Sequence, residues 1–159
     1  MFRCLPWFVC LAVFILDQLA KLYVSHALHL GQSMPVIKNI FHISLVRNTG
    51  VAFGLLKNHN TLLIIFSSVV ILYIGRFCLS DRAQGLASAP VSLGLILGGA
   101  VGNLLDRIRL GYIIDFLDFR IWPVFNIADS AITIGIILLG IEIIFKKIPM
   151  ANDKIQRPK

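Results

Sequence analysis

Acidic and amide side chains stand in this sequence at places where the surrounding residues are strongly apolar. Asp115 and Asp118 lie in YIIDFLDF, and Asp129 lies in FNIADSAITIG, three residues after Asn126. A carboxylate near the centre of a membrane helix costs about 3 kcal/mol on insertion scales, and such residues commonly mark functional sites. These carboxylates are therefore the first candidates for chemistry in the chain.

Two carboxylates brought close together can hydrolyse a peptide bond. Because like charges at short range do not both ionise easily, the pair tends to hold one proton between them. One member then takes a proton from water while the other gives a proton to the attacked carbonyl, without a covalent intermediate. We expect Asp115 and Asp129 to lie at the same membrane side and similar depth, because the connection between them must turn back. Spacing alone does not choose Asp115 over Asp118.

The surroundings of Asp129 predict the start of a helix. Asn126, Asp129 and Thr133 fall at helical spacing on one face of an apolar stretch. Asp129 lies about one turn from the predicted helix start, where the positive end of the helix dipole offsets part of the cost of burying a charge.

Polar residues in the first and third apolar stretches are candidates for a supporting role. Asp17 and Lys21 are four residues apart with the acid first, which favours an ion pair on one helix face. We interpret this pair as structural. Asn103 and Arg107 are also four apart, and Asp106 continues a ridge of glycines at 94, 98 and 102 that lets another helix approach closely.

Other hydrolytic signatures are missing from the sequence. It contains no H-E-x-x-H zinc motif and no G-x-S-x-G nucleophile motif. His26 and His29 are a weak candidate for metal binding, and we predict neither a metal nor a cofactor.

The elements that must position these side chains are membrane spans. The chain has 159 residues, of which 57% are hydrophobic and 14% charged, whereas soluble domains are about 25% charged. Four stretches reach the length of about 20 residues that a span needs, at about 4–24, 60–79, 88–107 and 124–145. The start resembles a signal peptide, but Asp17 and Lys21 precede the loose cleavage site, so we predict a retained first span. We therefore predict a single, mainly α-helical membrane domain over residues 1–159.

Charge gives limited information about orientation. The net charge is +7 and the bases are scattered at the ends of apolar runs, which favours anionic lipid over nucleic acid as the partner. Bases are almost equally divided between the two sides, but Lys146 and Lys147 after the last span favour cytoplasmic termini. The segments at about 25–59 and 108–123 are then extracytoplasmic.

The first of these segments predicts a small sheet on the outer membrane surface. In IFHISLV, Phe41, Ile43 and Leu45 alternate with polar residues, as in a half-buried strand. RNTG then supplies a turn, and VAFGLL is a candidate second strand. In the other segment, we expect aromatic anchors at the membrane interface, namely Phe116, Phe119 and Trp122.

Four motifs together give a family resemblance. GNLLDRIRLGYIIDF followed by FNIADSAITIG, with RNTGVAFG and LDQLAK before them, resembles the bacterial lipoprotein signal peptidases, also called signal peptidase II. The motifs occur in order over nearly the whole chain. The resemblance implies a four-helix aspartic endopeptidase of the bacterial cytoplasmic (inner) membrane, with both termini cytoplasmic and the active site near the outer face. A small sheet and a short surface helix would cradle the substrate.

The resemblance also implies substrates and site residues. The substrates are diacylglyceryl-prolipoproteins, cut just before the lipidated cysteine, and the cyclic peptide globomycin is the inhibitor. Asp115 and Asp129 correspond to the catalytic pair. Supporting or substrate-binding positions are Asp17, Lys21, Asn48, Gly50, Asn103, Asp106, Arg107 and Asn126. We predict a monomer in contact with membrane lipid.

Two other functions stay open from the residues alone. A small transporter or proton pathway would place its carboxylates along a route near the bilayer midplane, whereas these cluster toward one face. A non-catalytic assembly protein would use the glycine ridge for partners, and acid-to-amide substitutions would then damage stability rather than rate.

Overall fold

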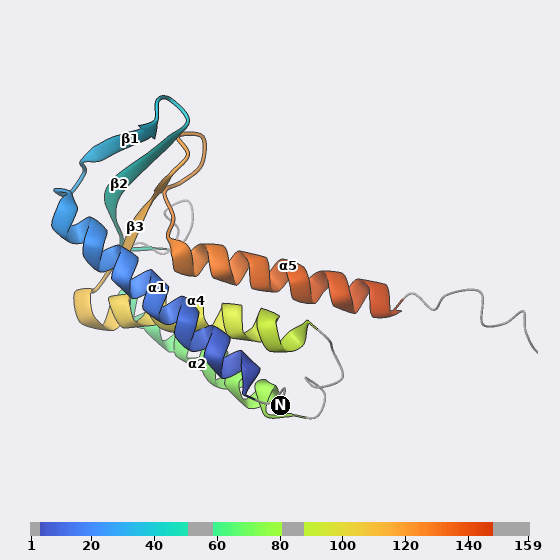
Figure 1. The fold of residues 1–159 in the computed structure, drawn as a ribbon. Helices are drawn as coiled ribbons and strands as arrows, with labels where there is room; N and C mark the ends of the chain where they lie inside the picture. Colours follow the sequence, from blue (N-terminus) through green and yellow to red (C-terminus); the bar gives the residue numbers. More distant parts are fainter. Residues whose placement is uncertain (1–3, 51–58, 81–87, 148–159) are drawn as a thin grey trace, which may run out of the picture.

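Four long helices form a bundle, and a small sheet lies at one end of it (Figure 1). The computed structural model describes residues 4–50, 59–80 and 88–147. The helices are α1 (Leu5–Ala27), α2 (Asn60–Cys78), α4 (Ala89–Leu110) and α5 (Ile127–Lys147). All four are long and apolar enough to cross a membrane, which confirms the predicted number of spans.

Helix boundaries differ from the predicted ones by a few residues, and two of these differences have a clear local reason. α4 continues to Leu110 because Gly111, at φ 81°, takes the left-handed conformation that closes a helix, and its N–H donates to the carbonyl of Arg107. α5 begins at Ile127 because Asn126, directly before it, bonds to the first turn through its side chain.

Helix α4 is the centre of the bundle and packs against the other three helices. A Cβ atom on Gly98 would lie 2.6 Å from the carbonyl oxygen of Cys10 in α1, a separation that real side chains do not adopt. The predicted glycine ridge is therefore confirmed, and the helix that it admits is α1 of the same chain.

The sheet has three antiparallel strands in the order β1 (Ser33–Ile37), β2 (Phe41–Asn48) and β3 (Ile113–Asp118). β2 is the strand predicted from alternation. β3 comes from the connection between α4 and α5, where no strand was predicted. The proposed second strand, VAFGLL, lies outside the described residues. The described residues include no short surface helix.

The strict alternation expected for β2 is wrong in its middle. The pairing with β3 shifts register between Ile43 and Val46, and this irregularity buries both Ser44 and Leu45. Ser44 binds Asp118, and Leu45 packs in an apolar cluster with α1.

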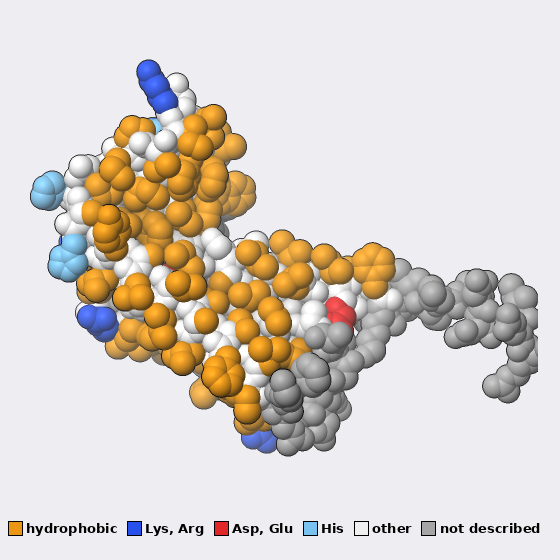
Figure 2. Space-filling model, viewed as in Figure 1, with side chains coloured by type: hydrophobic (Ala, Val, Ile, Leu, Met, Phe, Trp, Pro, Cys, Tyr) orange, Lys and Arg blue, Asp and Glu red, His pale blue; other side chains and the backbone are white. Residues whose placement is uncertain are grey.

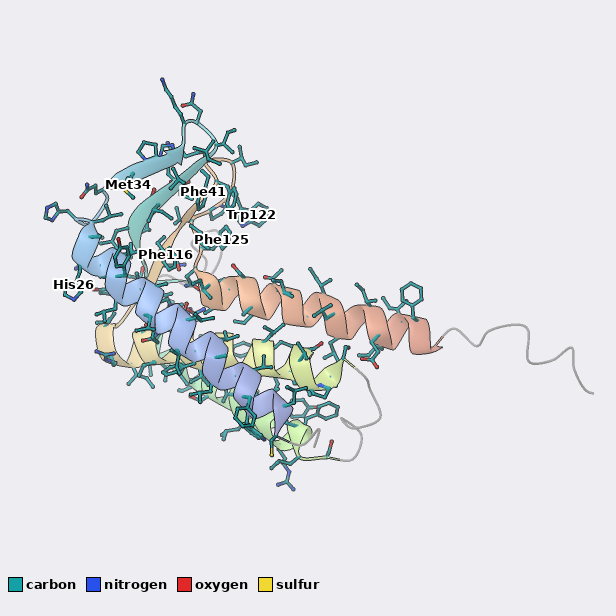
Figure 3. The ribbon with its side chains drawn as sticks, in the orientation of Figure 1. His26, Met34, Phe41, Phe116, Trp122 and Phe125 are labelled. Atoms are coloured by element: carbon teal, nitrogen blue, oxygen red, sulfur yellow. The ribbon has the colours of Figure 1, made fainter. Side chains whose placement is uncertain are left out.

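Hydrophobic side chains cover much of the visible surface of both the sheet and the helices (Figure 2). Trp122 is 61% exposed at the margin of the sheet, and Phe119 is also exposed, as interfacial anchors would be. The same expectation is wrong for Phe116, which is only 4% exposed. It packs in a buried cluster with Val24 of α1 and with Leu28, the residue that follows α1, so its side chain lies between β3 and the end of that helix (Figure 3).

Candidate active site

Asp115 and Asp129 lie near one another at the junction of the sheet and the bundle, where both contact Asn126. Asp115 lies on β3 and is 1% exposed, and Asp129 lies in the first turn of α5. Asn126 contacts both residues. Its Nδ2 donates to Asp115 Oδ1 at 2.7 Å, and its backbone N–H donates to Asp129 Oδ2 at 3.3 Å. The connection between β3 and α5 therefore reverses direction, as predicted, and Asn126 binds both carboxylates.

The position of Asp129 follows from how α5 begins. The first N–H groups of a helix have no partner within the helix. Asn126 Oδ1 accepts from the Asp129 N–H at 2.9 Å, while the Asp129 carboxylate accepts from the Asn126 N–H. This is the reciprocal arrangement of a capping box, so the start of α5 itself contributes to the orientation of Asp129.

Two further amides complete the hydrogen bonds of the carboxylates. Asn103 Nδ2 donates to Asp129 Oδ1 at 2.8 Å, and Asn48 Nδ2 donates to Asp115 Oδ2 at 2.9 Å. Asn48 Oδ1 in turn accepts from the Gly50 N–H at 3.0 Å, which fixes the orientation of its amide. Each of the four carboxylate oxygens therefore accepts a hydrogen bond from an N–H donor.

Arg107 holds the turn that carries Asn48. One guanidinium nitrogen donates to the Gly50 carbonyl at 3.0 Å. Asn60, at the start of α2, donates to the Arg107 carbonyl at 3.1 Å, so α2 and α4 are tied together beside this turn. Arg107 therefore positions the backbone of this turn.

The pair of Asp17 and Lys21 is formed and belongs to a larger buried network. Lys21 Nζ lies 2.8 Å from both Asp17 Oδ2 and Asp106 Oδ2 and donates to Asn103 Oδ1 at 2.9 Å. Gln18 was not predicted from the sequence, yet its Nε2 donates to Asp106 Oδ1 at 3.0 Å. Its signal was an amide next to an acid in an apolar stretch.

Asp118 lies apart from this network. Three positions along a strand place a side chain on the opposite face from Asp115. Its carboxylate accepts from Ser44 Oγ at 2.7 Å and from the side chain and backbone of Arg120 at 3.0 and 2.9 Å. Burial raises the pKa of Asp118, but these hydrogen bonds outweigh burial and hold the pKa below its usual value.

The environment of Asp115 has the opposite effect on its proton affinity. Burial, and then the negative charge of Asp129, raise the pKa of Asp115 to about 7, despite the hydrogen bonds from Asn48 and Asn126. A buried acid with a pKa near neutrality beside a second acid is the pattern of a proton-sharing pair.

The family model for signal peptidase (SPase) II matches residues 9–145 of this chain. The chain belongs to the signal peptidase II family.

Relatives named lipoprotein signal peptidase match most of the chain, and a solved bacterial membrane enzyme is similar to it in fold. The lipoprotein signal peptidase of Halothermothrix orenii is 47% identical over 133 residues, which are 84% of this chain and 90% of that protein. That of Nostoc punctiforme is 42% identical over 151 residues, 94% of each chain. A bacterial membrane enzyme solved by the in meso method at 2.3 Å resolution has a TM-score of 0.85 and 32% identity, with coverage of 97% of this chain and 94% of that one.

In this member of signal peptidase II, the polar residues selected from the sequence form one connected network. Hydrogen bonds and ion pairs join Asp17, Lys21, Asn48, Gly50, Asn103, Asp106, Arg107, Asp115, Asn126 and Asp129. Thr133 was predicted on the same helix face as Asn126 and Asp129, but its hydroxyl is exposed and donates to the Asp129 backbone carbonyl.

Proposed function

We propose that this chain is an aspartic endopeptidase that removes signal peptides from diacylglyceryl-modified prolipoproteins. Membership of signal peptidase II, with relatives named lipoprotein signal peptidase, supports the cleavage of lipoprotein signal peptides. The observation that carries the aspartic mechanism is the contact of Asn126 with both Asp115 and Asp129.

In the proposed reaction the carboxylates share one proton. The ionised member takes a proton from water as the water oxygen bonds to the scissile carbonyl carbon. The protonated member gives its proton to the carbonyl oxygen. Collapse of the intermediate breaks the C–N bond and passes a proton to the leaving amine. The raised pKa of Asp115, about 7, supports its holding the proton near neutral pH.

The depth of the pair supports a lipidated substrate cut just before its modified cysteine. Acyl chains favour the bilayer by about 0.8 kcal/mol per buried CH₂, which keeps the peptide bond beside the cysteine near the membrane surface. Asp129 lies in the first turn of an apolar helix, and Asp115 lies in the adjoining sheet, so the proposed pair is at one end of the spans.

The same reasoning gives an orientation. α1 begins and α5 ends away from the sheet (Figure 1). We place these ends on the cytoplasmic side of the bacterial inner membrane and the sheet at the outer face. Membrane lipid is then a partner, globomycin the expected inhibitor, and a monomer the working unit.

Cleavage of a purified diacylglyceryl-prolipoprotein in detergent tests the proposal. We expect the wild-type protein to release the signal peptide, and Asp115→Asn and Asp129→Asn to lose turnover while they remain folded. Asp118→Asn is the matched control and should still cut, because that side chain binds Ser44 and Arg120 instead. Near-normal cleavage by Asp115→Asn would refute the mechanism. If the wild-type protein cuts nothing, the peptidase proposal fails and a proton-flux assay in liposomes is the next experiment.

A further inference from the structure

Lys21 uses its three ammonium hydrogens on three different groups. It is 2% exposed, and Nζ lies 2.8 Å from Asp17 Oδ2, 2.8 Å from Asp106 Oδ2 and 2.9 Å from Asn103 Oδ1. An ammonium group has three donors and no acceptor, so its bonding capacity is filled by these three contacts.

Each of the two acids also binds the backbone next to one of the paired aspartates. Asp17 Oδ1 accepts from the Ala128 N–H at 3.0 Å, one residue before Asp129. Asp106 Oδ2 accepts from the Ile114 N–H at 3.3 Å, one residue before Asp115. Lys21 therefore joins the two side chains that hold α5 and β3 in place.

The third contact of Lys21 determines which way the Asn103 amide points. Asn103 Oδ1 accepts from Lys21 and also from Asn126 Nδ2, at 3.1 Å. Since both neighbours are donors, the amide oxygen must face them and the NH₂ group must face Asp129 Oδ1, at 2.8 Å. The reversed amide would set oxygen against carboxylate and NH₂ against ammonium.

We infer that Lys21 is a positioning residue of the aspartate pair. It orients the Asn103 amide toward Asp129 and, through Asp17 and Asp106, fixes the backbone beside both aspartates. The inference deepens the proposed function and rests on it for its effect on rate. Lys21 itself does not touch Asp115 or Asp129 through any hydrogen bond in the described structure.

The charged groups around the pair come from four elements. α1 contributes Asp17 and Lys21. α4 contributes Asp106 and Arg107, and the Arg107 guanidinium interacts electrostatically with Asp106, Asp115 and Asp129. β3 and α5 contribute the pair itself. Removing Lys21 takes away one of the two cations that lie near the pair among the described residues, and it releases the Asn103 donor. The ionised form of the pair therefore becomes less favourable.

The pH dependence of cleavage by Lys21→Met separates positioning from a purely structural role. Turnover needs one ionised carboxylate, so the acidic limb of the pH–rate profile should move to higher pH by on the order of one unit. We expect kcat to fall about 100-fold, with little change in KM, because the reacting groups are displaced. If the substitution only destabilised the fold, a smaller fraction of the enzyme would be active, but the pH–rate profile of that fraction would not shift.

Glu142→Gln provides a matched control. Glu142 is a partly buried acid of α5 that accepts from the N–H and hydroxyl of Ser88, at the start of α4. This contact lies at the other end of α4 from Asn103. The substitution should lower the melting temperature and leave the pH–rate profile unshifted.

Two additions make every outcome decisive. Lys21→Met leaves two buried acids without their cation, so Lys21→Gln, which removes the charge but keeps an amide donor at the same position, serves if the first variant does not fold. Infrared titration of the carboxyl band, assigned with Asp115→Asn and Asp129→Asn, follows the protonation of the pair without substrate. The positioning variant that folds should shift this titration toward higher pH.

The outcomes distinguish the two proposals. If the wild-type protein cleaves but the titration and pH–rate profile of the variant match it, the inference for Lys21 is wrong and the peptidase proposal stands. If the wild-type protein does not cleave but the variant titration shifts, the peptidase proposal is wrong and the positioning role of Lys21 stands.

Discussion

Asn126 Nδ2 donates a hydrogen bond of 2.7 Å to Asp115 Oδ1, from a side chain that is fully buried. The donor precedes α5 and the acceptor lies on β3, so this bond joins the helix and the strand that carry the proposed catalytic pair. The same side chain accepts from the Asp129 N–H. Asn126 is therefore the residue that contacts both carboxylates directly.

Asn126→Ala and Asn126→Ser should separate the two tasks of this side chain. Serine can still cap α5 but cannot reach Asp115 with an amide, whereas alanine does neither. We expect both variants to lose about 100-fold in kcat, because the pair is misplaced. Only Asn126→Ala should also lose about 1 kcal/mol of stability from the missing cap. Thermal unfolding and cleavage assays measure the two effects, and a fully active Asn126→Ser would contradict the role given to the amide.

The pH dependence of the wild-type rate should reflect the raised pKa of Asp115, about 7. The pair must keep one proton to protonate the carbonyl oxygen, so the rate should fall as pH rises through this value. This fall in rate on the alkaline side reports the titration of the coupled pair rather than that of one residue. A rate profile that stays flat to well above pH 7 would contradict proton sharing.

Stability should depend on pH in the same region. The pKa of Asp115 is higher in the folded protein than its usual 3.8, so the folded state binds the proton more tightly than the unfolded state does. This contribution is fully present below the unfolded value of 3.8 and is lost as pH rises through about 7. The melting temperature of the wild-type protein should therefore decline across this window, and Asp115→Asn should show a smaller decline.

Asn48→Ala should move the basic limb of the rate profile to higher pH. The hydrogen bond from Asn48 lowers the pKa of Asp115, whereas burial and the charge of Asp129 raise it. Removal of this hydrogen bond should therefore raise the pKa of Asp115 further. Arg47→Ala is the control on the same strand, since the Arg47 guanidinium lies 4.7 Å from the Tyr112 ring centroid and is exposed. A profile of Asn48→Ala that superimposes on that of Arg47→Ala would exclude this contribution.

Gly98→Ala and Gly140→Ala should have opposite consequences for stability. A Cβ on Gly98 would meet the Cys10 backbone oxygen at 2.6 Å, and overpacking of this kind costs about 1–3 kcal/mol. A Cβ on Gly140 would meet nothing within 4 Å, and alanine there favours the helix by up to about 1 kcal/mol. Thermal unfolding in detergent compares the two variants, and equal melting temperatures would refute the close contact of α4 with α1.

Much of the fold follows from local sequence. Runs of about 20 apolar residues predict the four spans because a bilayer requires that length, and alternation predicts β2. Asn126 and Asp129 indicate the start of α5 because a helix needs partners for its first N–H groups. The face shared by Asp17 and Lys21 follows from helical periodicity, and their ion pair is formed.

The tertiary structure decided how these parts meet. β3 was not predicted, because YIIDFLDF is apolar on both faces and its strand form depends on pairing with β2. Asp115 and Asp118 lie on opposite faces of this strand, and it is Asp115 that shares Asn126 with Asp129. The spacing in the sequence did not distinguish the two aspartates. The three contacts of Lys21 also required the fold, since Asn103 and Asp106 are more than 80 residues away. Helix and strand periods set which side chains share a face, whereas only long-range packing determines which faces come together.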